Sequence, residues 1–255
     1  MNTIATVYIH SFSVIDADGI TTRRGHNNWE DGQTGPQDIK RSQVLSRPYM
    51  AFGKLNLPDK LAFSAASLAL RDVSVSTPSA TALFLGIPEG SLSTDRAYRE
   101  SIIGGNPSPA LFSATLPSSP IADIAIYYHL KGPNVCFAGG DAPFIASIEY
   151  ALLQLSTGQL EEVLVVFVDE QRAEMNVSET APTPYATALF LSSIPPDFPA
   201  TVITLERLET ITEAPSLIEN ETTLIKYFFA LLKKKESLRI PVSVGGFIGY
   251  ISLQF

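Results

Sequence analysis

The sequence predicts an α/β domain in which helices pack on a central sheet. Short apolar runs typical of strands, such as residues 81–85 and 163–168, alternate with stretches of helical periodicity, such as residues 58–70 and 144–155. This alternation is typical of layered α/β domains. The chain has 255 residues, 45% of them hydrophobic, which is enough to bury one sizeable core. We therefore expect one domain over residues 1–255.

The first third of the chain predicts a strand, a loop and a helix. Residues 5–9 alternate between apolar and polar side chains and predict a strand. Residues 21–43 are polar and rich in glycine, so we expect a loop there. Residues 58–70 place an apolar stripe on one face of a helix. The stripe comprises Leu61, Ala65, Leu68 and Ala69.

The middle third predicts a strand followed by two helices. Residues 81–85 form the strand, and residues 93–103 form a helix for which Ser93 or Thr94 is the expected N-cap. Residues 111–128 predict a second, buried helix that Pro117 and Pro120 interrupt.

A strand, a sharp turn and a helix follow. The apolar run Val135, Cys136, Phe137 and Ala138 predicts the strand, a glycine pair predicts the turn, and Asp141 is expected to open the helix. Phe144, Ile148, Leu152 and Leu155 form its apolar stripe, and Gly158 is expected to end it. Near the end of the chain, residues 163–168, 185–191 and 242–255 predict strands and residues 222–235 predict a helix. The segment 195–215 gives no secure prediction.

Composition excludes several classes of function. The net charge of −8 disfavours a nucleic-acid surface, which needs clustered cations. One cysteine and three scattered histidines leave no disulfide and no spacing typical of a metal site, so we expect no metal and no cofactor. No segment reaches the length of apolar chain that spans a bilayer, and the chain starts without a signal-peptide pattern, so we expect a cytoplasmic protein with no membrane insertion.

Blocks between residues 45 and 192 resemble the amino-terminal half of the β-ketoacyl synthases, the condensing enzymes of fatty-acid and polyketide synthesis. One block is Pro109-Ala110-Leu111-Phe112 followed by Thr115-Leu116-Pro117, and another is Leu130-Lys131-Gly132-Pro133-Asn134. Their order and spacing carry the resemblance. It implies a thiolase-like layered α-β-α fold, truncated to about one ketosynthase half plus a short helix and strand.

The resemblance also implies that the catalytic residues are lost. Counted from Gly132 and Pro133, the family's catalytic cysteine falls on Asp141, and a carboxylate cannot carry an acyl chain as a thioester. Cys136 lies five residues earlier, and no histidine follows His129, so both catalytic histidines are absent as well.

A ketosynthase relative without these residues resembles the chain-length factors, in particular the partner subunits of aryl polyene pathways. The resemblance implies a heterodimer with a catalytic β-ketoacyl synthase, paired through Val135, Cys136, Phe137 and Ala138. It also implies an acyl tunnel walled by Leu111, Phe112, Leu116 and Ile121. Lys233, Lys234 and Lys235 close the last predicted helix, where cations suit the helix dipole, and this interpretation outweighs a docking role. Such a patch would also attract an acidic acyl carrier protein, which is a further expected partner.

Two other interpretations remain open at this point. The chain could be an independent thiolase-like acyltransferase or decarboxylase that uses Cys136 or Asp141. It could also be a homodimeric module that binds acyl groups or carrier protein. From the residues alone, Asp141 is expected to act as a helix N-cap and Cys136 as a small buried apolar residue.

Overall fold

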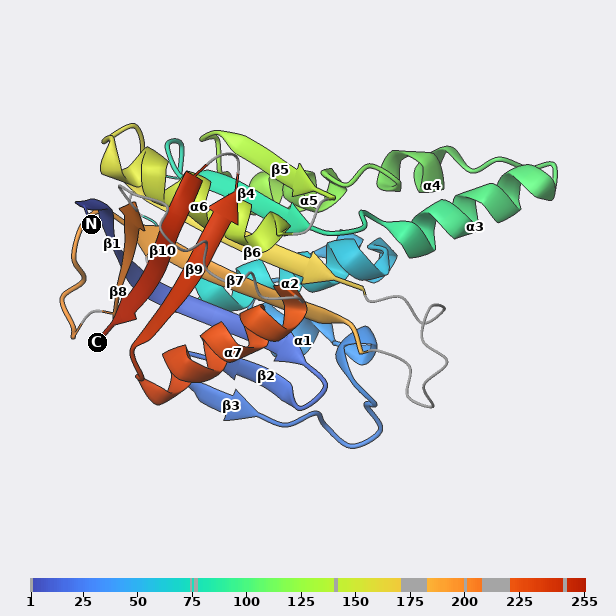
Figure 1. Ribbon diagram of the computed structural model, residues 1–255. Helices are drawn as coiled ribbons and strands as arrows, with labels where there is room; N and C mark the ends of the chain where they lie inside the picture. Colours follow the sequence, from blue (N-terminus) through green and yellow to red (C-terminus); the bar gives the residue numbers. More distant parts are fainter. Residues whose placement is uncertain are drawn as a thin grey trace.

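The computed structural model shows a mixed ten-stranded sheet with helices on both faces (Figure 1). The structure describes residues 2–73, 75, 78–139, 142–170, 183–199, 201–207, 221–244 and 247–255. The predicted layered α-β-α arrangement is confirmed.

The sheet is parallel at one end and antiparallel at the other. Its strand order is β5-β4-β6-β7-β1-β8-β10-β9, and the small strands β2 and β3 extend from β1. The bounds are β1 Asn2–Asp16, β2 Gly19–Thr22, β3 Gly25–Asn27, β4 Ala82–Ile87, β5 Asn134–Ala138, β6 Glu162–Asp169, β7 Tyr185–Ser192, β8 Thr201–Arg207, β9 Leu238–Val244 and β10 Phe247–Gln254. Among the described strands, only β5, β4 and β6 run parallel to one another. β5 stands at the end of the strand order and is therefore an edge strand.

β1 is the longest strand, and it organises the antiparallel part of the sheet. One of its edges pairs with β7, while the other pairs first with β8 and then with β2. The predicted strand 5–9 is therefore only the first half of β1. The predicted loop 21–43 is wrong in its first part, since Gly19–Thr22 and Gly25–Asn27 form a hairpin on β1. Pairing with β1 overrides their polar, glycine-rich local pattern.

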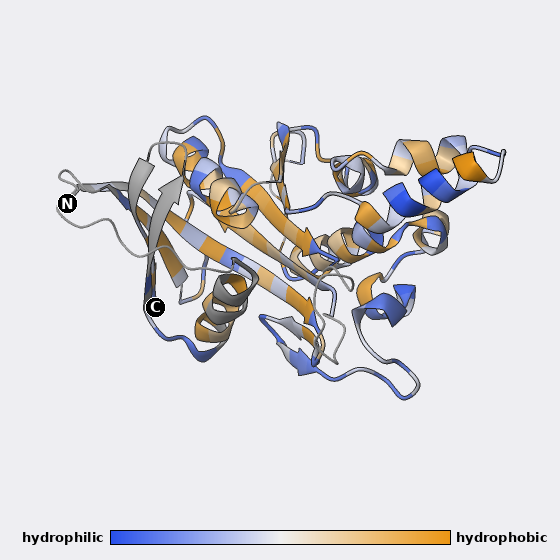
Figure 2. Cartoon of the chain, turned by 45° about the vertical axis from the view of Figure 1, so that its right-hand side comes forward, coloured by the Kyte–Doolittle hydropathy of each residue, from blue (hydrophilic) through white to orange (hydrophobic). Residues whose placement is uncertain are grey.

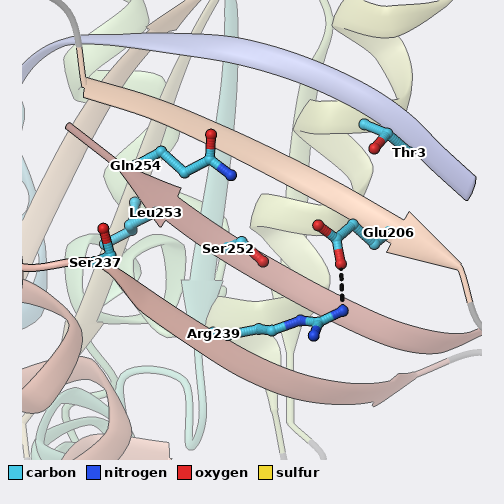
Figure 3. A pocket seen from close by; sticks show the side chains of 7 residues that line it. All are labelled: Thr3, Glu206, Ser237, Arg239, Ser252, Leu253 and Gln254. Carbon is cyan, nitrogen blue, oxygen red and sulfur yellow. Dashed lines mark hydrogen bonds and ion pairs between the residues drawn. The ribbon is translucent and has the colours of Figure 1, made fainter. Parts of the chain in front are cut away.

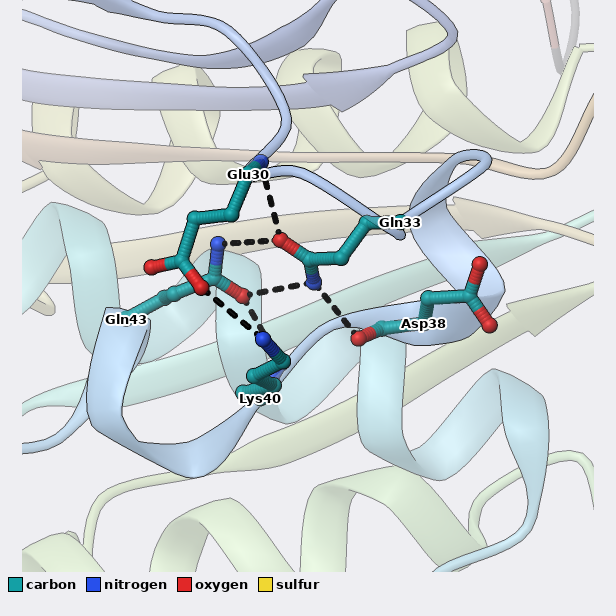
Figure 4. A network of polar contacts seen from close by, with 5 residues as sticks. All are labelled: Glu30, Gln33, Asp38, Lys40 and Gln43. Atoms are coloured by element: carbon teal, nitrogen blue, oxygen red, sulfur yellow. Dashed lines mark hydrogen bonds and ion pairs between the residues drawn. The ribbon is translucent and has the colours of Figure 1, made fainter.

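The rest of that segment is irregular but held by polar contacts. It contains the short helices η1 Pro36–Asp38, α1 Arg41–Val44 and η2 Met50–Lys54. The side-chain amides of Gln33 and Gln43 bond to each other, and Lys40 forms an ion pair of 2.9 Å with Glu30 (Figure 4). These contacts replace the backbone hydrogen bonds that a longer helix or strand would provide.

One face of the sheet carries α2 (Leu57–Leu70) and α5 (Ser119–Tyr128). The Asn56 side chain caps α2 by accepting the amide of Asp59 at 2.8 Å. Ser11 and Ser13 of β1 donate to carbonyl groups of α2 at 2.7 Å, so the helix is bonded to the sheet as well as packed on it.

The other face carries α6 (Pro143–Ser156) and α7 (Glu221–Lys234). The predicted stripe of α6 is buried there, and the ring of Phe144 contacts those of Phe228 and Phe229 from α7 at centroid distances of 6.0 and 6.1 Å. Gly158, at φ +69°, follows the end of α6 as predicted.

The carboxyl-terminal prediction needs two corrections. The single strand expected over 242–255 is a hairpin of β9 and β10, which lie on either side of the Gly245-Gly246 pair in the sequence. The antiparallel pairing of Leu238–Val244 with Phe247–Gln254 overrides the apolar continuity that predicted one strand. β8 was not predicted at all, because the prolines before it are typical of a loop.

Two helices extend beyond the sheet as an arm. They are α3 (Leu92–Ile103) and α4 (Pro109–Ala114), which pack on each other through the rings of Tyr98 and Phe112. The predicted helix 111–128 is therefore two helices, α4 and α5, with Pro120 in the first turn of α5.

The N-cap predicted for α3 is wrong. Ser91 occupies that position without a side-chain cap bond, and Ser93 instead bonds to Glu170 through its amide at 2.8 Å and its hydroxyl at 2.6 Å. This contact ties the base of the arm, formed by α3 and α4, to the segment after β6.

Within the described ranges, no helix has the length and apolar character needed to cross a bilayer. The same part of the chain holds no group of three or more His, Cys, Asp or Glu residues placed to bind a metal ion.

Candidate functional site

The candidate interface strand β5 lies at the edge of the sheet, parallel to β4. Cys136 is opposite Leu85 of β4, and the other edge of β5 has no partner strand among the described residues. Val135 and Phe137 pack against the core on the α6 face, Cys136 packs on the α2 face, and Ala138 is exposed at the end. The structure therefore brings the four predicted interface residues together on one edge.

Aromatic rings lie beside this edge. The ring of Phe137 is 5.8 Å from that of Tyr150 on α6, which is 5.0 Å from that of Phe84 on β4. Tyr150 remains partly exposed, so the aromatic row continues from the core to the surface next to β5. An edge strand flanked by rings offers both backbone hydrogen bonds and apolar area to a partner.

Cys136 does not have the environment of a reactive thiol. Its Sγ lies 3.5 Å from the carbonyl oxygen of Pro117, and burial raises its pKa to about 11. The thiolate is the nucleophilic form, so this side chain is protonated and weakly reactive near neutral pH.

Asp141, the residue at the lost nucleophile position, lies outside the described residues. The described residues on either side of it have a defined geometry. Gly139 has φ +74° and donates its amide to the Ile87 carbonyl at 3.1 Å, and α6 begins at Pro143. A strand thus passes into a helix within a few residues, as predicted, but Ala142 occupies the N-cap position expected for Asp141.

A glycine in β4 lets the start of α6 approach the sheet closely. A Cβ atom at Gly86 would lie 2.9 Å from the carbonyl oxygen of Pro143, so a larger residue would push the helix away. The close approach of α6 to the sheet therefore depends on a glycine in β4.

Three of the four predicted tunnel residues lie on or beside the arm. Leu111 and Phe112 belong to α4, and Leu116 follows it; Phe112 is 59% exposed and Leu116 is 58% exposed. Ile121 differs, since it is buried in the core on the α2 face. The structure thus places Ile121 in the core and not on the exposed surface of the arm.

The arm exposes further apolar residues that the sequence analysis missed. Ile102 and Ile103 of α3 are 51% and 71% exposed, and α3 buries only Thr94 while α4 buries no residue. Figure 2 shows hydrophobic turns along the projecting arm. The signal in the sequence was a pair of isoleucines directly before Gly104 and Gly105. Such exposed apolar area is typical of an interaction site.

Two carboxyl groups, the buried Asp59 and the half-buried Asp123, lie on α2 and α5. Burial raises the pKa of Asp59 to about 7, and the Ser119 hydroxyl donates to its Oδ1 at 2.6 Å. Burial also raises the pKa of Asp123, which accepts a bond of 2.9 Å from Tyr49. Both carboxyls hold α2, α5 and the preceding loop together, and neither was singled out from the sequence.

The lysine patch lies away from β5. Lys234 and Lys235 are exposed at the end of α7, and the side chain of Lys233 is outside the described residues. Lys235 lines a cavity beside β1, four strands from β5 in the sheet order.

An open hollow lies on the carboxyl-terminal strands. It has a volume of about 640 Å³, and an ion pair of 2.6 Å between Arg239 and Glu206 crosses it (Figure 3). Its lining is mostly polar and open, and Glu206 is the one carboxylate among the described residues that line it, so these residues offer no pair of acid and base groups.

Several solved structures share this fold. No protein-family profile and no curated protein matches the chain by sequence. A chain from the ketosynthase ApeO in complex with its chain length factor ApeC from Xenorhabdus doucetiae matches with a TM-score of 0.63 and 16% identity, over 98% of this chain and 99% of that one. A chain of the ishigamide ketosynthase/chain length factor matches with a TM-score of 0.61 and 18% identity, over 91% and 74%.

A chain of AntDE:AntF, a type II PKS acyl-carrier protein in complex with its ketosynthase bound to the hexaketide, matches with a TM-score of 0.66 and 11% identity. That alignment covers 98% of this chain and 99% of the other. The structural likeness therefore extends beyond residues 45–192, where the resemblance in sequence ends, and includes the strands of the carboxyl-terminal part.

The fold defines the class: this chain has the thiolase-like fold of the ketosynthases. More particularly, its fold is similar to that of chains found in complexes of a ketosynthase with a chain length factor.

Proposed function

We propose that this chain is a non-catalytic, chain-length-factor-like partner of an active β-ketoacyl synthase in polyene, fatty-acid or polyketide elongation. The observation that carries the proposal is the apolar edge strand β5 together with the arm, α3 and α4, whose isoleucines and phenylalanine are exposed in the single chain. A heterodimer would cover both surfaces at once. The likeness to chains of ketosynthase/chain length factor complexes supports this partner over others.

The chemistry of the remaining groups supports a non-catalytic role. Asp141 stands where the resemblance places the nucleophile, and no histidine follows His129. The raised pKa of Cys136 argues against a second nucleophile nearby. We therefore infer that the partner subunit performs the condensation.

The acyl tunnel would form between the arm and the partner. Leu111, Phe112 and Leu116 would supply its wall, because they are apolar and because Phe112 and Leu116 are exposed and Leu111 is half-buried in the single chain. Ile121 would act from behind by supporting α5. Acyl carrier protein would then be a partner of the complex, bringing the growing chain to the ketosynthase subunit.

Co-expression with a ketosynthase from the same genome tests the proposal. We expect one heterodimeric peak in size-exclusion chromatography. The variant Ala138→Lys places a charge on the exposed end of β5 and should divide this peak into two, since lysine on an edge opposes strand pairing. The matched control is Ile194→Lys, which changes an exposed residue between β7 and β8 and should leave the complex intact.

Other outcomes would identify the alternatives. Two separate peaks for the unmodified pair, with the ketosynthase fully active alone, would contradict the proposal. A covalent adduct on Cys136 after incubation with acyl thioesters, detected by intact mass, would indicate an independent acyltransferase. A stable homodimer that does not exchange with the ketosynthase would indicate a self-associating module.

A further inference from the structure

A break in strand pairing opens a cavity beside the middle of β1. On one edge of β1, pairing with β8 ends at Ile9 and pairing with β2 begins at Ser13. His10, Ser11 and Phe12 lie in the interval and line a cavity of about 290 Å³. The turn between β2 and β3, the segment before β8 and the end of α7 close its other sides. This cavity is distinct from the β5 edge and the arm.

His10 is the extra residue of a β-bulge. On the β7 side, Ile9 pairs with Leu191 and Ser11 pairs with Phe190, so His10 has no opposite residue. Bulges redirect a side chain and are common beside binding sites. The His10 Nε2 atom lies 2.8 Å from the Ile194 carbonyl oxygen, and because a carbonyl only accepts, Nε2 donates and Nδ1 is left as the second polar atom of the ring.

Cations gather around this cavity in an otherwise acidic chain. Arg23, Arg24 and Lys235 line it, and none of its described lining residues is acidic, although the net charge of the chain is −8. Arg24 is neutralised by an ion pair of 2.6 Å with the buried Asp72. Arg23 and Lys235 remain as the positive charges that a ligand would meet.

The guanidinium of Arg23 is held in a fixed place. Its central carbon lies 3.3 Å from the ring centroid of Phe198, and one of its nitrogens is 3.5 Å from the His10 carbonyl oxygen. The ring of Phe198 in turn lies 6.2 Å from that of His10. A stacked guanidinium keeps its edge available for two parallel hydrogen bonds to a carboxylate or phosphate.

The remaining wall is apolar and carries hydroxyl groups at its margin. Ile9, Phe12 and Leu232 are buried side chains of this wall, and Thr22 and Thr201 supply the hydroxyls. The combination of an apolar floor with two cations at the rim fits a ligand that has an anionic head and an apolar stem. The volume lies at the lower limit for small-molecule sites, so the ligand must be small.

We propose that this cavity binds a small organic anion, whose carboxylate or phosphate group contacts Arg23 and Lys235 and whose stem lies against Phe12 and Leu232. The binding site is independent of the proposed heterodimer. In this site the exposed Lys235 at the end of α7 binds the anion, and the proposed heterodimer interface does not use this residue.

Titration calorimetry on the full chain tests this proposal with four probes: hexyl phosphate, hexanoate, inorganic phosphate and hexanol. We expect hexyl phosphate or hexanoate to bind, with inorganic phosphate and hexanol weaker. Arg23→Gln and Lys235→Gln should each weaken binding of the anionic probe about tenfold, as expected for loss of a charge-assisted hydrogen bond. Both residues are exposed, so both variants should fold; Lys54→Gln, an exposed lysine elsewhere, is the matched control.

Proton NMR of the imidazole ring locates the site, because the chain has only three histidines. The signals of His10 should shift on binding, while those of His129 should not. Absence of binding by all four probes, or binding that neither variant weakens, would overturn the proposal. Equal affinity for inorganic phosphate and hexyl phosphate would overturn the role of the apolar wall. Binding of acyl carrier protein that depends on Arg23 and Lys235, without binding of either six-carbon anion, would assign the surface to a protein instead.

Discussion

At the scale of single residues, burial decides the reactivity of Cys136. Its position in the sequence, inside an apolar run, predicted a small buried side chain, and its half-buried place on β5 with a pKa raised to about 11 agrees. For Asp141, the position in the sequence does not predict the surroundings of the side chain. The sequence identifies what stands at that position, but not which atoms surround it.

The pH dependence of alkylation tests the state of Cys136. Iodoacetamide should modify the folded chain about 100-fold more slowly at pH 7.5 than the urea-unfolded chain, because the thiolate fraction falls about tenfold for each unit of pKa increase. The rate should rise steeply only as the pH approaches 11. Intact mass reports the product without ambiguity, since the chain has one cysteine. Rapid modification of the folded chain at pH 7.5 would contradict this assignment.

The raised pKa of Asp59 predicts an unusual pH dependence of stability. The folded state holds the proton up to about pH 7, whereas the unfolded state releases it near pH 4, so the free energy of unfolding should fall between these values as the pH rises. Asp59→Asn should remove this slope, which is at most about 1.4 kcal/mol per pH unit. Urea unfolding at pH 5 and pH 8 measures it. Asp197→Asn, at an exposed aspartate, is the control, and an identical slope in both variants would refute the prediction.

At the scale of elements, the strongly periodic segments were predictable and the paired ones were not. α2, α6, β4 and β6 lie within a few residues of their predicted bounds, because their apolar patterns coincide with the faces they bury. The hairpin β2–β3 and the strand β8 have weak local signals. They form because one edge of β1 provides backbone hydrogen-bond partners for both β2 and β8. For β8, this partner lies far away in the sequence.

The arm, α3 and α4, provides a prediction at this scale. Ile103→Lys should weaken the heterodimer at least tenfold with little change in the stability of the single chain, because Ile103 is 71% exposed and supports no core. Analytical ultracentrifugation of the co-expressed pair measures the dissociation. Ile194→Lys is the matched control at an exposed isoleucine outside the arm. Equal effects of the two variants on the dissociation constant would show that the arm is not part of the interface.

The same arm would set product length. Phe112→Trp enlarges a side chain of the proposed tunnel wall and should shorten the products of the assembled complex, because less depth remains for the acyl chain. Mass spectrometry of the products measures this. Unchanged product lengths in a complex that still assembles would mean that Phe112 contributes to contact only.

At the scale of the whole molecule, the chain buries an extensive apolar core but leaves some apolar surface exposed. One sheet joins all the described strands, and helices cover it on both faces, which supports our inference of a single domain over residues 1–255. The exposed arm and the β5 edge are the exceptions.

Hydrogen exchange provides a test at this scale. Amides of α3 and α4 should exchange rapidly in the single chain, because these helices bury almost no side chains, and should become protected in the heterodimer. Amides of α2 should be protected in both states. Equal protection of the arm with and without the ketosynthase would indicate that the partner does not cover it.

The sequence by itself determined the class of fold, the apolar faces of the main helices and strands, and the absence of a cysteine at position 141. These features follow from local periodicity and from residue identity, both of which are properties of the sequence alone. Only the tertiary structure decided that β5 is an edge strand, that Ile121 is buried while Phe112 is exposed, and that His10, Arg23 and Lys235 meet around one cavity. Each of these depends on which distant segments pair and pack together, and long-range pairing leaves no local pattern in the chain.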